Sequence, residues 1–117
     1  MQMPSDPTIA FGRVVAAFAG DPRVEPPASV RRAFGSNGLK VDGRIFAMLV
    51  RGALVVKLAR ERVAELVHAG DGTPFVSGGG RVMKEWVMLE KPTTSWLELA
   101  LEARTFVADG SKAVRRA

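Results

Sequence analysis

Few side chains in this sequence could carry out chemistry. The chain has one histidine, His68, and no cysteine, which excludes a disulfide framework, thiolate metal sites and a cysteine nucleophile. Glu65 lies three residues before His68, and the two could form a general-base pair, but no serine or cysteine nucleophile stands in a recognisable motif. We therefore interpret His68 as a surface residue near the end of a helix, where its ring can interact with free backbone carbonyls.

A glycine-rich segment, Ser77-Gly78-Gly79-Gly80-Arg81, is the other candidate for chemistry, because such segments can cradle a phosphate. A phosphate-binding loop needs a strand before it, a Gly-Lys-Ser/Thr sequence within it and a helix after it. Here a strand is expected to follow, so we predict a flexible loop over residues 71–81. The carboxylates are scattered and form no spaced acid–base pair. The sequence thus predicts a protein that is not an enzyme and holds neither a metal ion nor a cofactor.

The basic residues indicate a possible nucleic-acid partner. The chain has 17 Lys and Arg against 12 Asp and Glu, a net charge of +5. The excess lies around the strands in the middle of the chain and the helix after them, and in the C-terminal tail. The candidate phosphate contacts are Arg31, Arg32, Lys40 and Arg44. A nucleic-acid platform would interleave exposed aromatic residues with these cations, and the aromatic residues here fit core positions instead. Solvated charges that protect strand edges are the alternative interpretation.

Turn signals and hydrophobic periodicity indicate an α+β domain. Asp42-Gly43 is the pair that two-residue hairpins prefer, and Arg51-Gly52 marks a second break. We predict a curved antiparallel sheet of about five strands packed by helices, a two-layer sandwich. The predicted elements are a helix over 7–19, strands over 30–34, 38–41, 44–50 and 53–58, a helix over 61–69, a strand over 84–89 and a final helix opened by the capping box Ser95-Trp96-Leu97-Glu98.

The predicted strand over 44–50 is apolar on both sides. Antiparallel sheets usually wet one face, so such a strand indicates that both faces are covered. Helices can cover one face, and a second subunit can cover the other. We therefore predict a homodimer, or another protein partner, with Phe46, Met48 and Val50 as the interface, although the pattern itself favours neither face.

Residues 1–108 are expected to form one domain, followed by a basic, disordered tail over 109–117. The N-terminus lacks the basic start and apolar core of a signal peptide. The apolar run over 45–50 is far shorter than the roughly 20 residues that a membrane helix needs. We expect a cytoplasmic protein without a membrane segment.

The segment over residues 32–58 resembles the TfoX N-terminal domain family. The shared features are Phe34-Gly35, a glycine three residues later, Asp42-Gly43, Phe46-Ala47 and a later strand ending at Lys57. The segments over 70–75 and 83–87 and the helix over 96–107 also look like this family, so the resemblance covers about residues 8–108.

This resemblance implies a small α+β fold, similar to secretion chaperones and often dimeric. The family is named for bacterial regulators of natural competence that act in transcription activation and carry a second, helical domain, for which this chain leaves no room. No catalytic residue of the family can be carried over. The sequence therefore predicts a non-enzymatic, dimeric protein-interaction domain with a possible regulatory role, and the alternative is a transcription-associated nucleic-acid-binding regulator.

Overall fold

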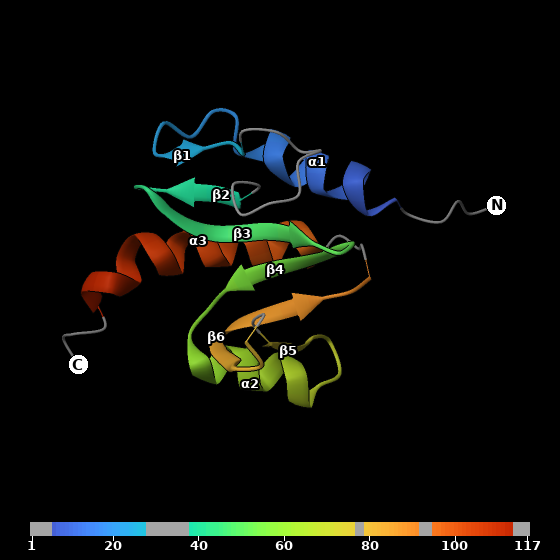
Figure 1. Ribbon diagram of the computed structural model, residues 1–117. Coiled ribbons are helices and arrows are strands. Elements are labelled where there is room, and N and C mark those ends of the chain that lie inside the picture. Colours follow the sequence, from blue (N-terminus) through green and yellow to red (C-terminus); the bar gives the residue numbers. More distant parts are fainter. Residues whose placement is uncertain (1–5, 28–37, 77–78, 92–94, 114–117) are drawn as a thin grey trace.

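In the computed structural model, residues 6–27, 38–76, 79–91 and 95–113 are described. They form one antiparallel sheet with helices packed on it, which confirms the α+β prediction (Figure 1). The elements in chain order are α1 (Pro7–Ala17), β1 (Val24–Glu25), β2 (Gly38–Val41), β3 (Arg44–Val50), β4 (Ala53–Lys57), α2 (Arg60–His68), β5 (Thr73–Val76), β6 (Val82–Leu89) and α3 (Ser95–Ala113).

The described strands lie in the order β1-β2-β3-β4-β6-β5, and each neighbouring pair is antiparallel. Two tight turns connect the central strands as predicted. Asp42 and Gly43 have φ of 52° and 82°, and Arg51 and Gly52 have φ of 47° and 82°. Positive φ at both central residues is what a type I′ hairpin turn requires, because its twist matches that of the strands.

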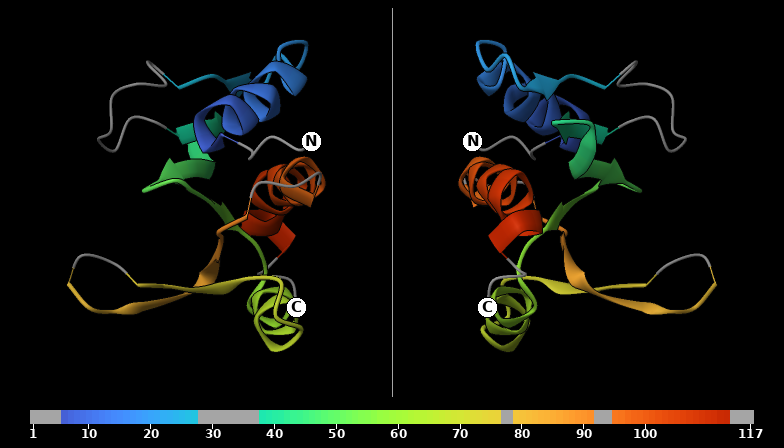
Figure 2. Two further views of the ribbon diagram at one scale, coloured as in Figure 1. Left: turned by 90° about the vertical axis from the view of Figure 1, so that its right-hand side faces the viewer. Right: turned by 90° about the vertical axis from the view of Figure 1, so that its left-hand side faces the viewer.

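All three helices lie on the same side of the sheet (Figure 2). Helix α3 crosses β3 and β4, α1 packs beside α3, and α2 packs on β6 and β5. The core between sheet and helices includes Trp96, which is 1% exposed, and the fully buried Phe11 and Leu54. The opposite side of the sheet, which no described helix covers, is called the open face below. No helix in the described part of the chain is long and apolar enough to cross a membrane.

A β-bulge in β3 changes which side chains reach the core. Leu39 pairs with Ala47 and Lys40 pairs with Ile45, so Phe46 has no partner on β2. An extra residue of this kind breaks the alternation of side chains along a strand. Phe46 and Ala47 are both fully buried in the core. The Phe46 ring meets that of Phe18 edge to face, with centroids 5.2 Å apart, a contact that contributes about 0.5–1.5 kcal/mol beyond its buried area.

Two strands occupy segments that the sequence predicted as irregular. β1 lies in the proline-containing segment over 21–28, for which the sequence predicted no element, and β5 lies in the predicted loop over 71–81. β5 contains Pro74 and stands at the edge of the sheet, where a residue without an N–H group is tolerated. The predicted strand over 30–34 lies outside the described residues. The described part of the sheet therefore has six strands where about five were expected.

The last helix is longer than predicted. It begins at Ser95, as the capping box indicates, and continues through Gly110 to Ala113. The predicted disordered tail from residue 109 is therefore wrong for 109–113, because a single glycine lowers helix propensity by only about 1 kcal/mol and does not end a helix by itself. Residues 114–117 lie outside the described residues.

Substitution by alanine should have opposite effects on the stability of the fold at two glycines. A Cβ at Gly72 would lie 2.6 Å from Cγ2 of Val87, whereas a Cβ at Gly12, inside α1, meets no atom within 4 Å. Val87 is fully buried, so we expect Gly72→Ala to lower the free energy of unfolding by about 1–3 kcal/mol through overpacking. Gly12→Ala should raise it by about 0.5–1 kcal/mol, because glycine has the lower helix propensity. Urea unfolding of both variants tests this, and a stabilised Gly72→Ala would contradict the packing described here.

Candidate functional site

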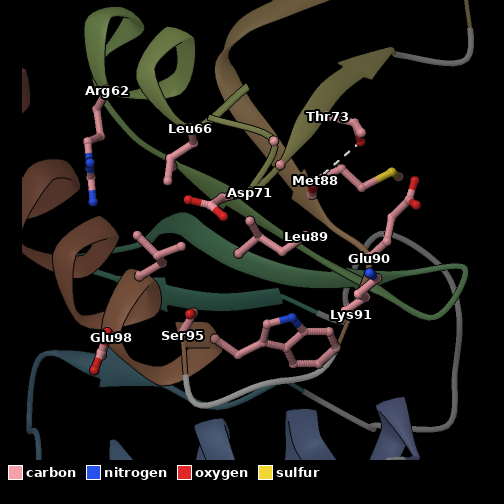
Figure 3. Close-up of a pocket in the computed structure, with 14 residues that line it drawn as sticks. Arg62, Leu66, Asp71, Thr73, Met88, Leu89, Glu90, Lys91, Ser95 and Glu98 are labelled. Atoms are coloured by element: carbon pink, nitrogen blue, oxygen red, sulfur yellow. Dashed lines mark hydrogen bonds between the residues drawn. The ribbon is translucent and has the colours of Figure 1, made fainter. Parts of the chain in front are cut away.

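A cavity of about 490 Å³ lies between α2, β5, β6 and the beginning of α3 (Figure 3). Its wall combines apolar side chains, among them Leu66 and Leu89, with the charged residues Arg62, Asp71 and Glu98. In the close-up these side chains converge from α2, from the loop after it and from α3. The cavity is therefore the first place to look for chemistry.

The polar side chains at this cavity form hydrogen bonds that connect neighbouring helices and strands. The Arg62 guanidinium donates to Glu102 on α3 at 2.9 Å and to Glu65 on its own helix at 3.1 Å. These hydrogen bonds raise the pKa of Arg62 above its ordinary value and tie α2 to α3. The Thr73 hydroxyl donates to the carbonyl of Met88 at 3.5 Å. None of the residues that line the cavity is a histidine or a cysteine.

One buried donor at this cavity lacks an acceptor. The Trp96 indole N–H, in a side chain that is almost fully buried, has no hydrogen-bond partner among the described residues. The nitrogen itself is shielded from water, so a ligand in the cavity does not reach it in this conformation. In the described part of the chain, no group of three or more His, Asp and Glu residues could hold a metal ion.

The open face carries a continuous row of residues across five strands. The register pairs Gly38 with Met48, Met48 with Val55, Val55 with Met88, and Met88 with Thr73. Directly opposed residues of neighbouring strands lie on the same face. Val55 alternates with Leu54 and Val56, which belong to the core cluster, so the row lies on the other side of the sheet. We call these five residues the cross-sheet row.

The three residues predicted to form the dimer interface lie on different faces of the sheet. Phe46 lies in the core because of the bulge in β3, which removes it from any surface contact. Met48 belongs to the cross-sheet row, and Val50, opposite Ala53, lies on the same open face. Both side chains are half-buried. Val55, which the sequence did not single out, is fully buried between them and β6.

The predicted nucleic-acid contacts are only partly described. Arg31 and Arg32 lie outside the described residues. Lys40 is half-buried on β2, and Arg44 is exposed at the beginning of β3. These two flank the Asp42-Gly43 turn, but Arg44 pairs with Val41 and Lys40 pairs with Ile45. Successive positions of a strand pair point to opposite faces of the sheet, so the hairpin does not bring the two cations together. Nearby, the side chain of Arg23 binds both carboxylate oxygens of Asp42.

A second hollow, of about 400 Å³, lies where β4, α2 and β6 meet. We call it the Trp86 hollow. It is lined by two apolar residues of β6 and by charged and aromatic side chains from all three elements: Val82, Met83, Lys57, Arg60, Lys84, Glu85 and Trp86. Lys57 Nζ lies 5.8 Å from the centroid of the Trp86 ring and 3.7 Å from the Glu85 carboxylate. No motif in the sequence points to a functional role for Trp86, because only the pairing of β4 with β6 brings these residues together.

The other candidate residues predicted from the sequence do not form a comparable cluster among the described residues. His68 is the exposed last residue of α2. Ser77 and Gly78 lie outside the described residues, and Gly80 adopts a φ of 85° in the connection between β5 and β6. The part of the glycine-rich segment that is described therefore precedes a strand, as expected, and not a helix.

Comparison of the chain with models of known protein families, with curated proteins and with solved structures finds no match. The resemblance to the TfoX N-terminal domain family therefore stays a prediction from the sequence motifs.

The ion pair between Asp21 and Arg104 gives the fold a dependence on pH. Arg104 on α3 binds Asp21 at 2.9 Å, and this hydrogen bond lowers the pKa of the Asp21 carboxyl below 3.8. A carboxyl with a depressed pKa in the folded state stabilises the fold above its unfolded pKa, and this stabilisation is lost as the pH falls through the folded value. We expect Asp21→Asn to lower the melting temperature at pH 7, with the wild-type and variant curves converging below about pH 4.

Thermal unfolding followed by circular dichroism over this pH range measures the difference. Asp71→Asn is the matched control, since Asp71 is exposed and forms no ion pair with any described residue. A constant difference between wild type and Asp21→Asn at every pH would rule out the ionised carboxylate as the cause.

Proposed function

We propose that this protein is a non-enzymatic, cytoplasmic protein-interaction domain that forms a homodimer through the open face of its sheet. The observation that carries the proposal is the cross-sheet row, which runs over five strands with no described helix above it. The resemblance of the sequence to TfoX N-terminal domains, which are often dimeric, supports the same proposal and suggests a regulatory role.

The open face has the composition of a contact surface. Met48 and Met88 are half-buried on either side of the fully buried Val55, and Ile45 and Val50 extend the apolar area along β3. A contiguous apolar area of this kind marks an interaction site more often than scattered apolar residues do. Methionine side chains are flexible and polarisable, so they adapt to an opposing surface.

The composition of the row favours a second copy of this chain as the occupant. Its central members, Met48, Val55 and Met88, are all apolar. A two-fold axis near the middle of the row would place this apolar surface against the same surface of the partner, as a symmetric dimer requires.

Met48→Asp tests the dimer directly. Wild-type protein at micromolar concentration is expected to have about twice the chain mass of 12.6 kDa by sedimentation equilibrium or light scattering. Burying an unpaired carboxylate in an apolar contact costs several kcal/mol, so Met48→Asp should raise the dimer dissociation constant by about 100-fold or more. Because Met48 is only half-buried in the single chain, the variant should remain folded as a monomer.

Leu101→Asp is the matched control. Leu101 is 47% exposed on α3, on the helix side of the sheet, and the same change there should leave the dimer intact. A monomeric wild-type protein contradicts the homodimer. A dimer that Leu101→Asp dissociates and Met48→Asp preserves moves the interface to the helices and contradicts the role of the open face.

A further inference from the structure

We propose that the Trp86 hollow binds single-stranded nucleic acid, with one base stacked on the indole ring and the neighbouring phosphates on Lys57, Arg60 and Lys84. The hollow adjoins the open face at Lys57 and Trp86, beside the surface proposed for the dimer, and the proposal does not depend on that dimer. It rests on an aromatic ring outside the core, on two cations that form no ion pair with any described residue, and on the way three elements bring these groups together.

Trp86 is the tryptophan that the fold leaves at the surface. Trp96 is 1% exposed in the core, whereas Trp86 is half-buried and lies on the open face opposite Lys57. A partly exposed ring on a sheet offers a base a flat apolar surface, and such stacking is tolerant of sequence because every base has a π face. In the free protein the Lys57 ammonium lies over this ring. Its flexible stem lets it move to a phosphate when a base takes its place.

The charges of the hollow favour an anion. Three cations and one carboxylate line it. Lys57 is paired with Glu85, but neither Arg60 nor Lys84 forms an ion pair with any residue that the structure describes. Both are exposed. In contrast, Arg23, Arg62 and Arg104 each bind a carboxylate elsewhere in the fold. Unpaired cations can neutralise phosphates without first losing an internal partner.

Stacking on Trp86 favours a single strand over a duplex. The described ends of the β5–β6 hairpin project from the body on the side away from the helices, next to this site (Figure 2). A base can stack on Trp86 only when it is not stacked within a double helix. An acidic peptide could pair with the cations but would leave the ring without a base to stack on. Single-stranded nucleic acid uses both features.

Fluorescence anisotropy with labelled single strands of about ten nucleotides, oligothymidylate and oligouridylate, tests the proposal. We expect binding at about 50 mM salt that weakens steeply at about 200 mM. Trp86→Ala should weaken binding about tenfold, whereas Trp86→Phe, which keeps a ring, should change it by about twofold at most. Lys84→Ala should reduce the slope of log affinity against log salt by about 0.7, the value for one lost phosphate contact on a single strand.

Intrinsic fluorescence locates the contact. Trp96 is buried, so quenching on binding should come from Trp86 and should be lost in Trp86→Phe while binding persists. Arg13→Ala is the matched charge control, because Arg13 is exposed on α1 and has no ion pair among the described residues. It should leave both the affinity and the salt slope unchanged.

Four results would overturn the proposal. They are the absence of binding at low salt, equal effects of Arg13→Ala and Lys84→Ala, tighter binding of a duplex of the same sequence, and binding of polyglutamate in place of the oligonucleotides. The molar mass of each variant is measured on the same samples, so that the test of oligonucleotide binding can be distinguished from the test of the homodimer. A monomer that binds oligonucleotides through Trp86 supports this inference alone.

Discussion

The bulge in β3 is the constraint on which both faces of the sheet depend. β3 is a central strand and is apolar along most of its length, so regular alternation would divide its large side chains equally between the two faces. The extra residue at Phe46 places Phe46 and Ala47 together under the helices and leaves Ile45 and Met48 outside. The same local irregularity thus completes the core with the Phe18–Phe46 contact and sets the composition of the open face.

Local signals in the sequence were enough to predict the architecture. Asp42-Gly43 and Arg51-Gly52 adopt the positive φ values that tight hairpins need, and the apolar stripe after Ser95 becomes the buried face of α3. β1 and β5 were missed because their strand character comes from pairing with β2 and β6 and not from their own residues. β5 contains Pro74, a residue that disfavours strands unless an edge position accepts it. Phe46 was misplaced because a bulge leaves no mark on hydrophobic alternation.

Met48 and Val50 were predicted as contact residues, but the extent of the two surfaces proposed to bind partners was beyond sequence reasoning for a related physical reason. The cross-sheet row joins residues from position 38 to position 88, and its existence depends on the register of four strand pairs. The Trp86 hollow likewise joins Lys57 to Trp86 through the β4–β6 pairing. A shift of any strand by one residue would move its side chains to the other face. Residue types and local spacing carry no information about that register.

The ion pairs of the fold explain why the positive charge of the chain acts mainly at one place on its surface. The net charge of +5 is spread along the chain, but the fold neutralises several cations by pairing each with a carboxylate. These pairs are Arg62 with Glu102 between α2 and α3, Arg104 with Asp21, and Arg23 with Asp42. These pairs fasten α3 to α2 and to the connection after α1, and β1 to the β2–β3 turn. Arg60 and Lys84 form no ion pair with any residue that the structure describes. They therefore dominate the field around Trp86, because unpaired charges act over about 10 Å at moderate salt whereas close pairs largely cancel. The carboxylates that stabilise the fold therefore also determine where the protein can attract an anion.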